Sequence, residues 1–163
     1  MKNKDYYKFN FLKYKVLGNG DYDLSSVTEY ETNSHWNIVC KSMPFDLIGE
    51  AKDLLTINSP SIDGVKVFTP KEGGIPLKHQ EVDIEFVCCS DDARRDMLRF
   101  RNFLIGADEK GALMGFKEEY TGINANFIIY KSFKQEIYHR REGINDIVIF
   151  TVSFLLPKPI NKV

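Results

Sequence analysis

The chain has 163 residues and a formal net charge of −1, from 22 basic and 23 acidic side chains. A balanced charge argues against a dedicated nucleic-acid binder, because such proteins draw much of their affinity from phosphates neutralised by lysine and arginine. The 43% hydrophobic share suits the core of one domain spanning residues 1–163, and no run of about 18 apolar residues predicts a membrane span. With no apolar signal core after Met1 and no disulfide framework among three cysteines, we expect a soluble protein of a reducing compartment.

A hairpin is predicted at the start of the chain. The segments Lys8–Leu17 and Asp21–Tyr30 flank Gly18-Asn19-Gly20, and Asn-Gly is the strongest signal for a two-residue hairpin turn. A further short strand is predicted at His35–Lys41. The segment Pro44–Leu55 is ambiguous, because its leucines have helical spacing but a glycine interrupts them. Turns are predicted at Ser59–Gly64 and Glu72–Gly74.

Period-two alternation predicts a half-buried strand over Glu81–Cys89. Its apolar positions face one way, and its three carboxylates face the other way. The apolar set is Val82, Ile84, Phe86 and Cys88, and the acidic set is Glu81, Asp83 and Glu85.

The clearest helix is predicted from about Asp91 to Ile105. Ser90 is a suitable N-cap, and Gly106 stands where a glycine commonly follows a helix. Apolar residues recur at helical spacing and predict the face that packs on the sheet. That stripe consists of Ala93, Met97, Phe100 and Leu104, widened by Leu98 and Ile105.

Strands are also predicted in the C-terminal third. Phe127–Tyr130 and Phe133–Tyr138 form one bent strand or two, and a turn at residues 140–143 leads to the last strand, Ile147–Leu156. Pro157 ends that strand. Its second face is apolar as well, which predicts that it is covered on both sides or partly by a neighbouring subunit. The sequence thus predicts a mainly β (α+β) fold, an antiparallel β-sandwich or barrel-like domain with one substantial helix packed on the sheet.

No arrangement of residues predicts catalysis, a cofactor or a metal site. The histidines at 35, 79 and 139 lack metal-ligand spacing, and Gly18-Asn19-Gly20 leads into a strand rather than a phosphate-binding helix. The adjacent Cys88 and Cys89 point to opposite faces of a strand, so a core cysteine beside an exposed one is expected. Glu81, Asp83 and Glu85 could hold a cation, but a plain polar face is the more common outcome.

Charge is segregated in the middle of the sequence, where an acidic strand face is followed at once by an arginine-rich helix. We therefore treat both as candidate surfaces for a subunit interface or a lumen, because self-assembling proteins bury complementary surfaces. The candidate residues are Glu81, Asp83, Glu85, Arg94, Arg95, Arg99 and Arg101.

The order of these motifs resembles small tail proteins of phages and prophages from the Bacteroides group, over roughly residues 34–159. The resemblance is carried by Trp36–Lys41, Pro44-Phe45, Glu50–Leu54, Asp63-Gly64 with Val67 and Pro70, Ile75–Lys78, Glu81–Phe86, Arg101–Gly106 and Phe150–Phe154 before Pro157. More distantly, the layout is similar to tail-tube proteins and to the N-terminal domain of siphophage distal tail proteins.

The resemblance implies a structural virion protein, not an enzyme, with no cofactor. Such protomers assemble in the bacterial host cytoplasm into rings, commonly of six, that stack in the virion tail, contact other phage tail proteins and surround a lumen for DNA without binding it specifically. The distal tail proteins usually carry a second, galectin-like domain, which we do not expect within these 163 residues, and this leaves the position along the tail open. Two alternatives remain: a monomeric β-sandwich module that binds a ligand such as carbohydrate, and a tail-completion or assembly factor.

Overall fold

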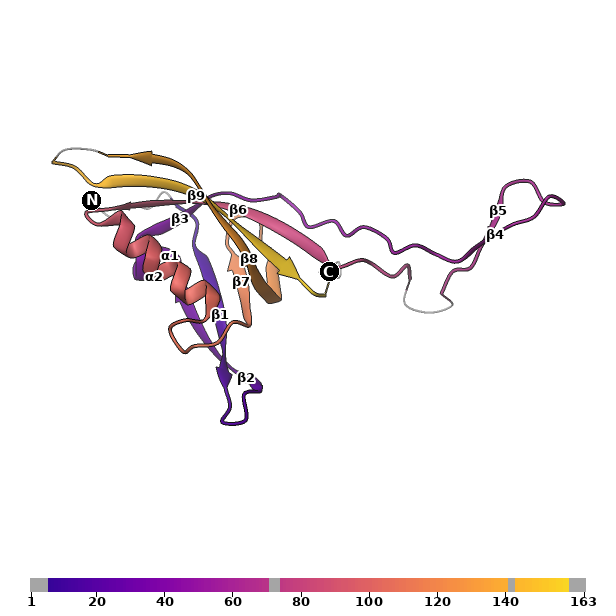
Figure 1. Ribbon diagram of the computed structural model, residues 1–163, viewed down its shortest axis with the longest axis horizontal. Coiled ribbons are helices and arrows are strands. Elements are labelled where there is room, and N and C mark those ends of the chain that lie inside the picture. Colours follow the sequence, from indigo (N-terminus) through magenta and orange to yellow (C-terminus); the bar gives the residue numbers. More distant parts are fainter. Residues whose placement is uncertain (1–5, 71–73, 141–142, 159–163) are drawn as a thin grey trace.

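The computed structural model describes residues 6–70, 74–140 and 143–158, with the side chains of residues 135 and 136 left out. It shows a body of strands and two helices from which a long arm projects (Figure 1). The mainly β, α+β fold predicted from the sequence is confirmed. Among the described residues, no helix has the length and apolar character needed to cross a membrane.

The body is built on one antiparallel sheet with the strand order β2-β1-β7-β8-β9-β6-β3. The strands are β1 (Phe9–Val16), β2 (Tyr22–Glu31), β3 (Ile38–Ser42), β6 (Gln80–Ser90), β7 (Met114–Glu118), β8 (Asn124–His139) and β9 (Asp146–Leu156). The first part of β8 pairs with β7, and the rest pairs with β9 across two register shifts. Because β8 bends in this way, β6, β8 and β9 pass across β1 and β7, and two layers face each other (Figure 1).

The predicted N-terminal hairpin is confirmed as β1 and β2, and the two C-terminal segments form the single bent strand β8. The prediction of a strand at His35–Lys41 was wrong in part. His35 and Trp36 belong to a short helix, α1 (Thr32–Trp36), and the strand begins only at Ile38. Asn37 ends α1 in the left-handed conformation at φ 54°, which an asparagine tolerates better than most residues. This turn places Trp36 in the core, where its ring centre lies 4.7 Å from that of Phe103.

The main helix, α2 (Ala93–Ile105), lies where the sequence predicts it but begins two residues later. The Asp92 side chain, not Ser90, caps it by accepting a hydrogen bond from the Arg95 N–H at 3.1 Å. The buried face is also rotated from the predicted one. Leu98 and Ile105 are about 40% exposed, whereas Phe103, absent from the predicted stripe, is buried.

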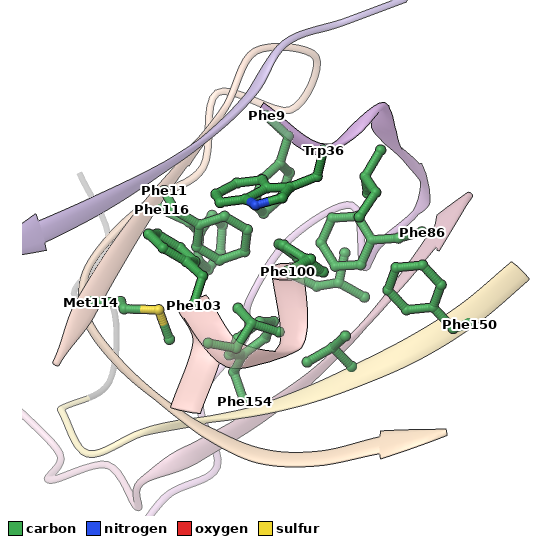
Figure 2. Packing of buried hydrophobic residues seen from close by; sticks show 14 of the residues in the cluster. Phe9, Phe11, Trp36, Phe86, Phe100, Phe103, Met114, Phe116, Phe150 and Phe154 are labelled. Atoms are coloured by element: carbon green, nitrogen blue, oxygen red, sulfur yellow. The ribbon is translucent and has the colours of Figure 1, made fainter. Parts of the chain in front are cut away.

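The core between the two layers is aromatic (Figure 2). Phe100 of α2 lies 5.7 Å from Phe11 and 5.5 Å from Phe86, ring centre to ring centre, and so joins the layers. The other large rings of this cluster are Phe9, Trp36, Phe103, Phe116, Phe150 and Phe154.

The sequence pattern does not predict strand β7, because this strand is short and contains glycine, which is disfavoured in strands. Gly115 is required there, since a Cβ at this position would lie 2.6 Å from the Ala125 carbonyl oxygen. A close approach of two backbones, and not a turn, therefore explains this glycine.

A long arm leaves the body between β3 and β6, and its described residues, 43–70 and 74–79, contain no helix. The helical alternative for Pro44–Leu55 is therefore excluded. The two sides of the arm pair near the body, where the Lys52 N–H donates to the Pro76 carbonyl at 2.8 Å. They pair again at the far end in a hairpin of β4 (Thr56–Asn58) and β5 (Val65–Val67), which encloses the predicted turn at Ser59–Gly64. The predicted turns at 72–74 and 140–143 fall largely outside the described residues.

Candidate interaction surfaces

The acidic face predicted for Glu81–Cys89 exists on β6, but its charge is largely compensated. Glu81 forms an ion pair with Lys131 of β8 at 2.6 Å, and Glu85 forms one with Lys41 of β3 at 2.8 Å. Asp83 accepts a hydrogen bond from the Ser153 hydroxyl of β9. This face therefore presents alternating charges from adjacent strands, because residues opposite one another on a sheet face lie close enough to pair.

The arginines of α2 divide into two groups. Arg95 and Arg99 lie 3.4 Å and 3.7 Å from the carboxylate of Asp96 on the same helix. Arg94 and Arg101 are exposed and form no ion pair with the described residues. These two lie seven residues apart and therefore share a helix face, with the exposed Leu98 between them.

The predicted acidic and basic surfaces do not meet within one molecule. The helix packs its phenylalanines against the inner face of β6 and β9, with Phe100 at 5.5 Å from Phe86 and 6.0 Å from Phe150. The carboxylates of β6 alternate with those inner residues and project from the opposite face. Contact between the two surfaces would thus require two molecules.

Asp96 is the one buried carboxylate of this region, only 1% exposed. Burial works to raise the pKa of the Asp96 carboxyl, but hydrogen bonds from the side chains of Ser90, Asn37 and Arg95 outweigh burial and lower it. The Asn37 amide donates to it at 3.0 Å and so links α2 to the end of α1. Asp96 therefore holds two elements together.

The second face of β9 is half-covered by its own neighbours. Ile147, Ile149 and Leu155 are half-buried, and Ile149 pairs with Val87 on one side and with Ile137 on the other. Ile137 itself is 42% exposed, so the apolar strip stays open to solvent at that end. Coverage by a neighbouring subunit remains a prediction.

The arm carries an apolar surface that the sequence analysis missed. The tip hairpin, residues 55–68, places Leu55, Ile57 and Phe68 on one face, because Ile57 pairs with Lys66 and the Phe68 N–H donates to the Leu55 carbonyl at 2.9 Å. These three side chains are 69%, 49% and 42% exposed. Alternating residues on both sides of a Pro- and Gly-containing turn were the signal that could have predicted this hairpin.

A cleft of about 530 Å³ lies at the root of the arm. Strand β3, the first residues of the arm, the segment before β1, and the end of β7 with the turn after it line the cleft. The lining residues are Tyr6, Tyr7, Val39, Cys40, Lys41, Ser42, Met43, Phe45, Glu118, Tyr120 and Thr121. The rings of Tyr7 and Tyr120 are 4.7 Å apart and more than half exposed, so the mouth of the cleft is aromatic.

The Glu118 carboxylate in the cleft is already hydrogen-bonded within the chain. The Glu118 carboxylate accepts hydrogen bonds from the N–H groups of Tyr120 at 2.9 Å and Thr121 at 2.6 Å. Burial, with a smaller contribution from Glu118, raises the pKa of the Cys40 thiol to about 12, so the thiol is protonated at neutral pH. These groups suit a binding surface better than nucleophilic chemistry.

The two adjacent cysteines occupy opposite faces of β6. Cys88 is buried and Cys89 is exposed, as their opposite strand faces predict. Within the described part of the chain, His, Cys, Asp and Glu side chains form no group of three or more that could hold a metal ion.

Neither a family model nor a curated protein sequence matches this chain. Among solved structures, the fold is similar to that of a phage hub protein. That protein is SPP1 Dit (gp 19.1), described as a paradigm of the hub adsorption apparatus in phages that infect Gram-positive bacteria. The TM-score is 0.52 at 12% sequence identity, over 92% of this chain and 50% of that one, so this chain spans half the length of SPP1 Dit.

Proposed function

We propose that this protein is a structural component of a phage or prophage tail, and that copies of it assemble into a ring of the tail tube or its distal end. The observation that carries the proposal is the similarity of nearly the whole chain to a distal tail hub protein, at 92% coverage. The ring, hexameric in this proposal, contacts other tail proteins in the virion after assembly in the host cytoplasm. The Bacteroides-group affiliation rests on the sequence resemblance.

Within the ring, the acidic face of β6 in one copy meets the helix α2 of the next. Arg94 and Arg101 are the arginines that supply this contact, because Arg95 and Arg99 already contact Asp96. The two surfaces lie on opposite sides of one molecule, which suits a head-to-tail contact that closes into a ring.

Solution mass tests the proposal directly. Light scattering over a concentration series should give a discrete multiple of the 18.8 kDa chain mass, and negative-stain images should show rings with a central opening. A chain that stays monomeric at the highest soluble concentration contradicts the proposal. A mass that reaches the expected multiple only after a second tail protein is added would favour an assembly or completion factor.

One observation favours a second candidate function, a monomeric β-sandwich module that binds carbohydrate. Aromatic rings that flank a cleft can stack on sugar rings, and Tyr7 and Tyr120 flank the cleft at the root of the arm. Titration with oligosaccharides, followed by calorimetry, tests this candidate. Saturable binding that is lost in Tyr120→Ala, by a protein that remains monomeric, would replace the ring proposal.

A further inference from the structure

Met43 and Leu47 at the root of the arm pack against the core, whereas the tip hairpin has no packing partner among the described residues. A two-stranded hairpin is marginally stable in water unless one of its faces packs on something. The tip hairpin has strands of three residues, and it stands well away from the body (Figure 1). Its apolar face of Leu55, Ile57 and Phe68 is therefore built to be covered by another molecule.

The arm exposes a large total apolar area. Nine large apolar side chains between Phe45 and Ile75 are 42–81% exposed. At roughly 150–200 Å² per large side chain, they present on the order of 900 Å². This total is spread along the arm and over both faces of the tip hairpin, and Leu55, Ile57 and Phe68 supply on the order of 280 Å² of it, which suits an anchor contact within a larger interface.

The cleft at the root of the arm has the size and chemistry to receive the tip. Its volume of about 530 Å³ lies within the range of roughly 300–1,000 Å³ that is typical of binding sites. Its wall contains Tyr7, Tyr120 and Phe45, the last of these 81% exposed. Buried aromatic anchors dominate the energy of protein interfaces, so tyrosines at the mouth suit a docked apolar hairpin.

Charge does not oppose this docking. The tip hairpin, residues 55–68, has one acidic and one basic side chain, Asp63 and Lys66, and Lys66 lies opposite Ile57 on the docking face. In the cleft, Lys41 is paired with Glu85 at 2.8 Å, and Glu118 accepts its hydrogen bonds from the adjacent turn. The long stem of Lys66 allows its ammonium group to stay in solvent at the rim, so docking does not require the costly burial of an uncompensated charge.

The length of the arm makes the contact intermolecular. Met43 to Leu55 spans about 40 Å of extended chain at ~3.3 Å per residue, and the cleft lies at the opposite end of the arm from the tip. We propose that the tip hairpin of one copy docks, through Leu55, Ile57 and Phe68, into the root cleft of a second copy. The proposal rests on the ring proposed above and adds an apolar contact to the one between β6 and α2. Exposed charge pairs contribute little on their own, so the docked tip supplies most of the affinity between subunits.

A tip variant tests the inference. Ile57→Ser with Phe68→Ser should raise the dissociation constant of the assembly at least about tenfold, because interface anchors carry most of the binding energy. The thermal melting curve should stay unchanged, which shows that the body is folded. Leu24→Ser is the matched control: Leu24 is 54% exposed on β2, outside both the arm and the cleft, and its replacement should leave assembly intact.

A mixing experiment identifies the receptor site. A cleft variant, Tyr7→Ala with Tyr120→Ala, keeps the tip, and the tip variant keeps the cleft. Each alone should be monomeric, but a mixture should form a one-to-one dimer through the single intact pair of surfaces. If both are monomeric and the mixture forms no dimer, the tip does not use this cleft and the inference is overturned.

Cross-linking gives a second readout. In a Cys89→Ser background, Asn58→Cys beside the docking face and Ser42→Cys at the cleft leave the anchors in place, and a short bismaleimide should join them between copies, giving a ladder of multimers on a denaturing gel. Cys40 and Cys88 should not react, because burial raises the pKa of both thiols to about 12. A chain that forms rings but shows no ladder would overturn the inference.

The outcomes separate the two proposals. If the wild-type protein forms rings and the tip variant forms them equally well, the inference fails while the proposed function stands. If the wild-type chain remains monomeric at all concentrations, both fail, and oligosaccharide binding at the cleft would then explain the exposed tyrosines.

Discussion

Phe100 is the side chain on which the packing of α2 depends. It is fully buried, and its ring lies 5.2 Å from Trp36, 5.5 Å from Phe86 and 5.7 Å from Phe11. Phe100→Ala should lower the free energy of unfolding by about 3–5 kcal/mol, because a cavity remains where both layers met the ring. Urea denaturation measures this. Leu98→Ala on the exposed face is the control, and a loss below about 1 kcal/mol for Phe100→Ala would contradict the packing.

Lys13 provides a pH test of the junction between β1 and α2. Its ammonium group donates to the Phe103 carbonyl at 2.6 Å and to the Gly111 carbonyl, and it lies 4.3 Å from the centre of the Phe103 ring. Burial lowers the pKa of Lys13 to about 8, opposed by Asp108 and reinforced by Lys110. Because the unfolded chain keeps the proton up to about pH 10.4, the folded state binds fewer protons between these values, and the stability contributed by this group rises with pH.

We therefore expect the stability of the wild-type protein, relative to Lys13→Met, to increase between about pH 8 and pH 10, by on the order of 1–3 kcal/mol. Urea midpoints of both proteins at matched pH values give the difference and cancel the titration of other groups. Parallel pH profiles for the two proteins would show that Lys13 keeps its ordinary pKa.

At the scale of elements, the arm is separable from the body. Lys52 and Pro76 are directly hydrogen-bonded across the arm, so an Asn-Gly turn can replace residues 53–75. The shortened chain should melt within about 3 °C of the wild-type protein, because β4 and β5 pair with one another and not with the sheet of the body.

Calorimetry and solution mass measure the two consequences. The shortened chain should also be monomeric, since it lacks the tip that joins the copies. A large fall in melting temperature would mean instead that the arm is part of the folding unit.

At the scale of the whole molecule, Asp83→Lys distinguishes the roles open to the acidic face. If this face meets the arginines of an adjacent copy, the substitution should weaken assembly, most strongly at low salt, where screening is least. Rings of unchanged mass with a raised affinity for duplex DNA would show instead that the face lines the lumen. If neither quantity changes, the face is solvated surface. Glu109→Lys, an exposed carboxylate beyond α2, is the control for net charge.

A second whole-molecule prediction concerns metal. Treatment with a chelator should leave the melting temperature unchanged, because a metal bound only by the folded state would stabilise it by mass action. A fall of many degrees would point to Glu81, Asp83 and Glu85, or to the histidines, as ligands.

The strands that line the core were predictable from the sequence. Strands β6 and β9 lie within one residue of the predicted ends, because each alternates between a core face and an outer face. The body of α2 was predictable for the same reason, through its helical spacing and Gly106. The rotation of its buried face toward Phe103 was not, since it depends on rings contributed by α1 and β1.

The candidate surfaces were also predictable only in part. Sequence placed the carboxylates and arginines on separate faces, because alternation and helical spacing are local properties. Only the tertiary structure decided that those faces lie on opposite sides of the molecule, that Lys131 and Lys41 neutralise two of the carboxylates, and that an extended arm ends in an apolar hairpin beyond the body. The physical reason is the sequence separation of the interacting residues. Periodicity shows which side of one element is apolar, because it involves only neighbouring residues. Strand pairing and the position of the arm depend on contacts between residues that are distant in sequence.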